Sequence, residues 1–411
     1  MSTLSQILSD VGELPEDASV FVSGCAAEIP DLSPALESLR GKGKITVSGI
    51  FLPGLNRGDY TVVSENMYCR TFFMTPQLAS SASGRVEYCP WRYREIVRDY
   101  LSKPTDVAIV MLSPPDERGV CSYGVTSDFA PLILPNATVK IGVINAHMPR
   151  VAGASIPLSA LDHCVHIDEP LLVSRDAKID DTSRAIAQYI APFVIDGATL
   201  QLGLGSIPGA VAGTLMNRRN LRVHSGLIDS SIFLLEEAGA LDTNHPIFGG
   251  VALGSAEFLQ SLHENPRLTL QSIDKTHDIT AIANTPSFIA INGALEVDLL
   301  GQTNSFVLPS GFMSGQGGLP EFVTGALASP GGRSIIALNA TAAKGKQSKI
   351  VSRLSGGIPS IPASDADVVV TEFGVAELRG KSLSQRVEAM ISIADPRHRD
   401  LLRQEAGAVL N

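Results

Sequence analysis

The sequence predicts an α/β protein of two tandem domains, each built around a parallel β-sheet. Three observations support this fold class. The 411 residues exceed the ~250–300 at which a single core stops growing. Short apolar, β-branched runs recur between turn signals, as buried parallel strands require. The stretch from Asp17 to Gly24 also resembles the stretch from Asp196 to Gly203 at a constant offset of 179 residues, which indicates a duplicated unit.

The apolar runs place the strands of each sheet. In the first half, we expect strands at 44–47, 107–112 and 139–144. In the second half, we expect strands at 199–204, 221–226, 288–291, 334–338 and 368–371. Asp180 and Asp181 suit the N-terminus of a helix that opens the second half. We therefore expect one domain at 1–179 and another at 180–411.

The stretch from Thr199 to Met216 predicts a strand, a tight turn at Gly203 and Gly205, and a helix. Two glycines let backbone amides approach a ligand, and a helix N-terminus favours an anion. Ligands of open α/β sheets bind beyond the carboxyl ends of the strands. We therefore expect chemistry where the next strand ends in a polar turn, at His224, Ser225 and Gly226.

Composition excludes several classes of partner. The net charge of −10 argues against a nucleic-acid surface, and no apolar run approaches the ~18 residues of a membrane span. The five cysteines include no CxxC pair, which predicts reduced thiols in the cytoplasm. His163 and His166 have no third ligand at metal spacing, so we expect no metal site.

Six stretches carry a resemblance to a known family. They are 113–119, 145–150, 196–208, 294–302, 331–338 and 371–381. Over nearly its whole length the chain resembles the acetyl-CoA hydrolase/CoA-transferase family, which includes 4-hydroxybutyrate CoA-transferase. The resemblance implies two CoA-transferase-type, Rossmann-like α/β domains with the active site in the cleft between them. It also implies that coenzyme A or an acyl-CoA is the substrate, with a small acceptor. We further expect a homo-oligomer, in the form of a dimer.

The resemblance also shows a departure at the expected nucleophile. Family members use the glutamate of a His-Ser/Thr-Glu motif to attack the thioester, and the glutamate then carries CoA. The aligned motif here is His224-Ser225-Gly226, in flanks that align without a gap, so the carboxylate is absent. Other family residues are also replaced: a histidine by Gly49, a glutamine-valine-aspartate by Leu319-Pro320-Glu321, and an arginine by Ala363.

Several side chains are candidates to replace the missing carboxylate, and each has a structural alternative. Asp229 could instead cap the next helix, and Glu296 could serve structure. Cys25 could act as a thiolate or be a buried inert thiol. The catalytic candidates are Glu28, His224, Ser225, the position of Gly226, and Asp229.

Glycines and lysines are the candidates for CoA binding. Gly315 to Gly318 could form a backbone cradle. Lys344 and Lys346 are part of a basic cluster that could meet CoA phosphates or could be a solvated loop. The assigned set is Gly203, Gly205, Gly254, Asn304, Gly315, Gln316, Gly317, Gly318, Lys344 and Lys346.

Three functions follow. The first is a CoA-transferase-family enzyme that acts on an acyl-CoA without the usual glutamyl nucleophile. The second is an acyl-CoA thioesterase or direct acyltransferase, in which Gly226 leaves a gap of glutamate size for water or an acceptor, with His224 or Glu28 as base. The third is a catalytically silent CoA-binding protein. The sequence does not name the acyl group.

Overall fold

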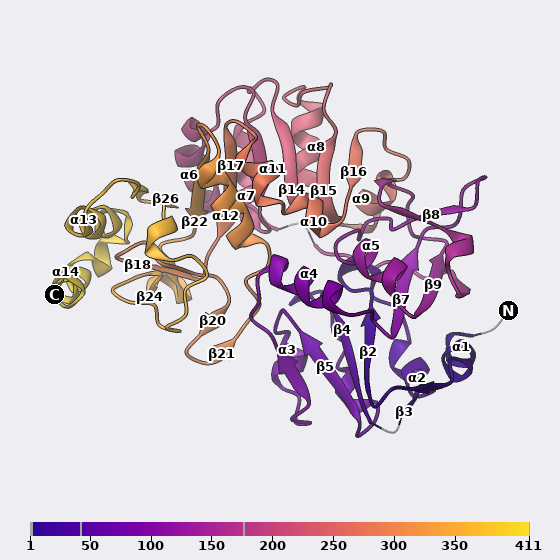
Figure 1. Ribbon diagram of the computed structural model, residues 1–411. Helices are drawn as coiled ribbons and strands as arrows, with labels where there is room; N and C mark the ends of the chain where they lie inside the picture. Colours follow the sequence, from indigo (N-terminus) through magenta and orange to yellow (C-terminus); the bar gives the residue numbers. More distant parts are fainter. Residues whose placement is uncertain (1–2, 42, 176, 411) are drawn as a thin grey trace. The chain divides into compact units, whose positions relative to one another are not determined.

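The computed structural model describes residues 3–41, 43–175 and 177–410, which form two compact units (Figure 1). The first unit contains the chain up to Arg175 together with 248–276 and 313–317. The second unit contains the remaining described residues. The later half of the chain therefore returns twice to the first unit. The division into domains at 1–179 and 180–411 stays a prediction.

The first unit is built on a parallel sheet in the order β12-β9-β7-β2-β4-β5-β6. Its strands are β2 (Asp17–Val22), β4 (Lys44–Gly49), β5 (Met67–Thr71), β6 (Val86–Tyr88), β7 (Val107–Leu112), β9 (Val139–Asn145) and β12 (His163–Ile167). All six residues of β7 are buried, as expected of a central strand covered on both faces.

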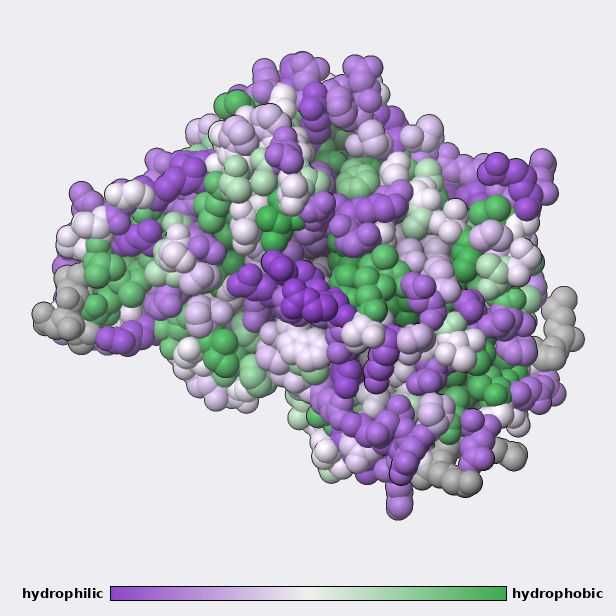
Figure 2. Space-filling view, viewed as in Figure 1, coloured by the Kyte–Doolittle hydropathy of each residue, from purple (hydrophilic) through white to green (hydrophobic). Residues whose placement is uncertain are grey.

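Short helices and strands complete the first unit. The helices are α1 (Leu4–Asp10), α2 (Leu32–Leu36), α3 (Pro76–Ala79), α4 (Tyr93–Ser102), α5 (Ala130–Ile133), α9 (Ala256–Ser261) and α10 (Ile273–Thr276). The additional strands are β1 (Glu13–Leu14), β3 (Arg40–Gly41), β8 (Val120–Ser122), β10 (Ala152–Gly153), β11 (Ser155–Pro157), β15 (Ile247–Ala252) and β16 (Leu268–Leu270). Hydrophilic side chains gather over α4 in Figure 2, in agreement with its single buried residue, Ile96.

The second unit contains a sheet in the order β14-β13-β17-β22-β26-β27, parallel except for β27. Its strands are β13 (Thr199–Leu202), β14 (Arg222–Ile228), β17 (Phe288–Gly293), β22 (Arg333–Ala337), β26 (Val368–Thr371) and β27 (Gly374–Glu377). Smaller strands are β18 (Glu296–Asp298), β19 (Thr303–Asn304), β20 (Val307–Leu308), β21 (Gly311–Phe312), β23 (Thr341–Ala342), β24 (Gln347–Ser348) and β25 (Ile350–Val351).

The helices of the second unit include several that begin at a capping side chain. They are α6 (Asp181–Ile190), α7 (Ser206–Thr214), α8 (Ser230–Glu237), α11 (Ile279–Ala283), α12 (Leu319–Ala328), α13 (Leu383–Ile393) and α14 (Arg399–Leu410). Asp180 caps α6 by accepting a hydrogen bond from the Ser183 amide at 2.8 Å, as predicted.

Strand order supports the predicted duplication. The order β12-β9-β7-β2-β4 in the first unit corresponds to β26-β22-β17-β13-β14 in the second. β2 and β13, which carry the repeated sequence, occupy the same place in the two orders. The α/β fold class is confirmed. One strand end was predicted wrongly: β14 continues through Gly226 to Ile228, so the expected polar turn is part of the strand.

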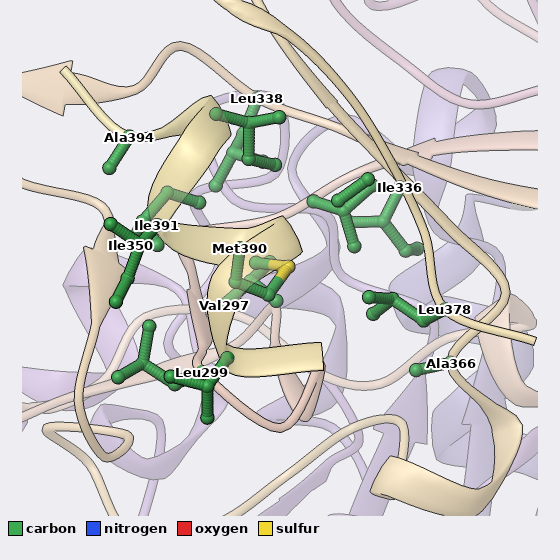
Figure 3. Packing of buried hydrophobic residues seen from close by; sticks show 14 of the residues in the cluster. Val297, Leu299, Ile336, Leu338, Ile350, Ala366, Leu378, Met390, Ile391 and Ala394 are labelled. Atoms are coloured by element: carbon green, nitrogen blue, oxygen red, sulfur yellow. The ribbon is translucent and has the colours of Figure 1, made fainter. Parts of the chain in front are cut away.

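The end of the second unit has its own apolar core. Val297, Leu338, Ile350 and Met390 are buried members of a cluster in which α13 packs beside β18, β22 and β25 (Figure 3). Met390 is fully buried near the centre of this view. The apolar stripe of α13 therefore holds this part of the chain against the sheet.

We expect Met390→Ala to lower the free energy of unfolding by about 2–5 kcal/mol, because it opens a cavity in this cluster. The matched control is Leu383→Ala in the same helix, where the side chain is 54% exposed. This control should change stability by no more than about 0.5 kcal/mol. Urea unfolding measures both, and equal losses would contradict the assignment of Met390 to the core.

Candidate functional site

The carboxyl ends of the parallel strands in the second unit bring several predicted residues to one edge. Gly203 follows β13, and His224 and Gly226 lie within β14, four and two residues before its end at Ile228. Ala294 follows β17, and Glu372 follows β26. Such an edge is where open α/β sheets bind ligands. It is the candidate site of this unit.

The turn after β13 has the predicted geometry. The Gly203 amide donates to Ile291 O at 2.9 Å, which ties the turn to β17. Gly205 has φ 121° and precedes the first residue of α7. Only glycine adopts this conformation readily. The contact of this turn with CoA stays a prediction.

The side chains of β14 alternate between two environments. Ser225 is fully buried, and its hydroxyl donates to Leu202 O at 3.1 Å. This bond uses the hydroxyl to join β14 to β13. His224 lies edge-on to Phe288 and Phe322, with ring centroids 5.7 Å and 6.4 Å away. Ser225 thus has a structural partner, and His224 belongs to an aromatic cluster.

The space beside Gly226 is filled by His277. A Cβ built on Gly226 would lie 2.8 Å from Cε1 and Nε2 of the His277 ring and 3.3 Å from Phe322. A Cβ on Gly318 would lie 2.0 Å from the same Nε2. The predicted gap of glutamate size is therefore wrong. Gly226 makes room for a histidine of this chain and not for water or an acceptor.

His277 is only 8% exposed, and the centroid of its ring lies 4.5 Å from that of Phe322. Burial, helped by the nearby His224, lowers the pKa of His277 to about 3. The imidazole is therefore neutral at physiological pH. Sequence reasoning did not find His277, because no motif or spacing links it to Gly226.

The other carboxylate candidates of this unit serve structure. The Asp229 side chain accepts from the Ser231 amide at 3.0 Å and caps α8, which confirms the capping alternative. Glu296 is buried and accepts from Asn304 Nδ2 at 2.9 Å and from the Ser355 amide at 2.8 Å. Neither carboxylate is presented as a nucleophile.

Asn304 is also fully buried, and its side chain is occupied by the chain itself. Its Nδ2 donates to Val307 O at 2.6 Å as well as to Glu296, and its Oδ1 accepts from the amides of Phe306 and Val307. A contact with CoA would have to break one of these bonds. The assignment of Asn304 to CoA binding finds no support in this placement.

In the first unit, Glu28 lies beyond the carboxyl end of β2 and is partly buried. Its Oε1 accepts from the Gly58 amide at 3.3 Å. Burial raises the pKa of Glu28, and hydrogen bonds from Asn56 and Gly58 oppose that rise. A carboxyl with this environment can serve as an acid or a base nearer neutral pH than an ordinary glutamate.

Cys25 lies three residues before Glu28 and is buried. Burial raises its pKa well above the ordinary value, and the charges of Asp128 and Glu28 add to the rise. The reactive form of cysteine is the thiolate, which this site disfavours. The structure confirms that the thiol is buried, as the structural alternative expects.

The predicted glycine loop packs against its own unit. A Cβ on Gly315 would lie 2.0 Å from Phe72 O, and the Met74 amide donates to Ser314 O at 3.0 Å. Gln316 Nε2 donates to Pro90 O at 3.2 Å. A Cβ on Gly254 would meet the Phe258 ring at 2.4 Å. Close packing within the chain accounts for these glycines, and a CoA cradle stays a prediction.

Lys344 and Lys346 are exposed between β23 and β24, where a 3₁₀ turn spans Ala343–Gly345. The neighbouring carbonyl of Gly345 accepts from His398 Nε2 at 3.0 Å. The two ammonium groups therefore stand on a surface that could meet phosphates. Among the residues that the structure describes, no group of three or more His, Cys, Asp or Glu side chains could hold a metal ion. Within this same part of the chain, no helix is long and apolar enough to span a membrane.

The buried imidazole predicts a specific acid sensitivity. Because its folded pKa of about 3 lies below the ordinary 6.5, the unfolded chain gains a proton that the folded chain cannot accept. This contribution to stability is complete above about pH 6.5 and is lost as the pH falls toward about 3. Wild type should therefore lose stability between about pH 7 and about pH 5, and His277→Asn should not lose this contribution. The difference in free energy of unfolding between the two proteins, measured in urea, should shrink over this range. His166→Asn, which changes an exposed histidine, should show no such trend. Parallel pH profiles for wild type and His277→Asn would contradict the assignment.

Comparisons with known proteins identify the family. The model of the acetyl-CoA hydrolase/transferase N-terminal domain matches residues 65–179, and that of the C-terminal domain matches 254–406. The chain is 37% identical to 4-hydroxybutyrate coenzyme A transferase of Clostridium kluyveri, over 96% of this chain and 95% of the relative. RipA from Yersinia pestis has a similar structure, with a TM-score of 0.87, 28% identity and coverage of 100% and 97%. A 4-hydroxybutyrate CoA-transferase from Porphyromonas gingivalis has a TM-score of 0.81, 29% identity and coverage of 99% and 97%. The chain belongs to the acetyl-CoA hydrolase/transferase family.

Proposed function

We propose that this enzyme acts on an acyl-CoA without a glutamyl-CoA intermediate and passes the acyl group directly to a small acceptor or to water. Relatives named as CoA-transferases and as an acetyl-CoA hydrolase support an acyl thioester as the substrate. By analogy with those names, one acceptor class is a small carboxylic acid: its carboxylate attacks the thioester carbonyl to give a mixed anhydride and CoA thiolate, and the thiolate then attacks the acceptor's carbonyl carbon, which yields a new acyl-CoA and releases the first acid. The acyl group itself is left open.

The proposal that no glutamyl intermediate forms rests on one observation. Gly226 stands where the family motif has its glutamate, and the His277 ring lies 2.8 Å from where its Cβ would be. Glycine has no group that can form an anhydride or a thioester. The neighbouring ring also leaves no room for a longer residue. The two-step exchange through an enzyme-bound CoA therefore has no carboxylate at this position.

The remaining groups fit a direct attack. A base with a pKa near 3 is too weak to deprotonate an acceptor efficiently near neutral pH, so His277 shapes the site rather than activating the nucleophile. We assign the role of base to Glu28 or His224. Glu28 is favoured by the burial that raises its pKa. A carboxylic acid acceptor needs no base, whereas water does.

A second candidate is a CoA-binding protein without catalysis. It is favoured by the structural use of Ser225 and by the ring that fills the space beside Gly226. Incubation with several acyl-CoAs and acids, followed by mass spectrometry, separates the functions. Free acid means hydrolysis, and a new acyl-CoA or an acylated acceptor means transfer. Unchanged substrate together with calorimetric CoA binding means a binder and would overturn the proposed activity.

We expect Gly226→Glu alone to form no glutamyl-CoA, because its side chain would overlap the His277 ring. The double variant Gly226→Glu with His277→Ala should gain a borohydride-reducible adduct at residue 226, since it has both the carboxylate and the space. Peptide mapping after acyl-CoA treatment and reduction detects it, with His277→Ala alone as the control. A reduced Glu28 or Glu296 in the wild type would show that the nucleophile has moved, and would refute the proposal.

We expect Lys344→Ala with Lys346→Ala to weaken CoA binding, since each charge-assisted contact contributes ~1.5–3 kcal/mol. A larger loss for CoA than for dephospho-CoA would place the contact at the 3′-phosphate, and equal losses would place it at the pyrophosphate. Calorimetry measures both. Lys178→Ala with Lys381→Ala removes the same charge from other exposed positions and should leave affinity unchanged. Unchanged affinity in the first variant would remove the loop from the site.

A further inference from the structure

We propose that Lys349 is a self-acylation site, which takes an acyl group from an acyl thioester bound at the carboxyl edge of the second unit. The family's chemistry does not use this lysine as a nucleophile. The inference rests on the proposed function for the binding of acyl-CoA. It goes beyond that function because the acceptor is the chain itself.

Hydrogen bonds to residues just beyond β17 and β22 fix the position of Lys349. The residue lies between β24 and β25, and its ammonium donates to Ala294 O at 3.1 Å, just beyond β17. Its backbone amide donates to Ala340 O at 2.8 Å, beyond β22. The amine is therefore held at the edge where parallel strands end and ligands of such sheets bind.

Glu372 belongs to the hydrogen-bond network that also holds the backbone of Lys349. It follows β26, and its Oε2 accepts from the Ala340 amide at 2.8 Å. Ala340 thus bonds to both residues. Its carbonyl accepts from the Lys349 backbone amide, and its own amide donates to the Glu372 carboxylate. The Glu372 charge acts on Lys349.

The environment makes the amine more nucleophilic than an exposed lysine. Burial lowers the pKa of Lys349 and outweighs the opposite effect of Glu372, so more of the amine is uncharged. Lys344 and Lys346 lie in the β23–β24 hairpin just before Lys349 and are exposed. They provide an internal comparison only a few residues away.

The step is balanced with the thioester as its only co-reactant. The uncharged Nζ attacks the thioester carbonyl carbon, a C–N bond forms, and the C–S bond breaks. The proton lost from nitrogen passes to the leaving thiolate. The products are an Nε-acyl-lysine and free CoA thiol. The amide is stable, so each chain is modified once and the reaction does not turn over.

The test is incubation of the full-length wild type with acetyl-CoA, followed by quantitative peptide mapping. We expect Lys349 to be acetylated faster than Lys344 or Lys346 by about tenfold or more, because binding makes the attack effectively unimolecular. Lys349→Arg should lose the major adduct, and the double variant Lys344→Arg with Lys346→Arg should keep it. Denatured wild type should show no preference among the three lysines.

Acetyl phosphate, an acyl donor without CoA, provides the second comparison. It should not reproduce the preference for Lys349, since it is not held by a CoA site. Even acetylation of the three lysines by acetyl-CoA would overturn the inference. Labelling of Lys349 by acetyl phosphate but not by acetyl-CoA would also overturn it. Calorimetry with CoA separates the two proposals: binding without labelling defeats only the self-acylation, and absent binding defeats the proposed function as well.

Discussion

The packing of one imidazole between two glycines is the constraint on which the candidate site depends. The His277 ring comes within 2.8 Å of where a Cβ of Gly226 would be and within 2.0 Å of where a Cβ of Gly318 would be. Interiors are close-packed, so neither glycine can gain a side chain unless the ring moves. The end of β14 and the start of α12 are thereby fixed around a residue from a third segment. A substitution at Gly226 or Gly318 therefore requires a compensating change at His277.

This packing surrounds His224 and Gly226 with aromatic rings. Phe288 and Phe322 stack with an interplanar angle of 13°, and both contact the His224 ring edge-on. Charge is found further along the same sheet edge, at Lys349 and Glu372. Aromatic rings thus lie beside His224 and Gly226, whereas Lys349 follows β24 and Glu372 follows β26.

Local patterns predicted the fold well because buried parallel strands are continuous apolar runs. The strands expected at 107–112 and 368–371 have these bounds in the structure. The prediction failed at 221–226, where polar and glycine residues resemble a turn although the backbone of β14 continues to Ile228. Asp229, predicted either to cap α8 or to react, does cap it, because capping depends only on local chemistry. His277 was missed because its contacts join segments distant in sequence, which no local pattern records.

The glycines of the candidate site show why a missing side chain is ambiguous in a sequence. A glycine indicates where a side chain is absent but not which group occupies that space. At Gly226, Gly315 and Gly318 the chain itself fills it, with an imidazole or a backbone carbonyl. At Gly205, φ is 121° and no atom lies within 4 Å of where a Cβ would be, so conformation alone requires glycine and the neighbouring space is open. Of these four glycines, Gly205 in the turn after β13 is therefore the one beside which the backbone leaves space for a ligand group.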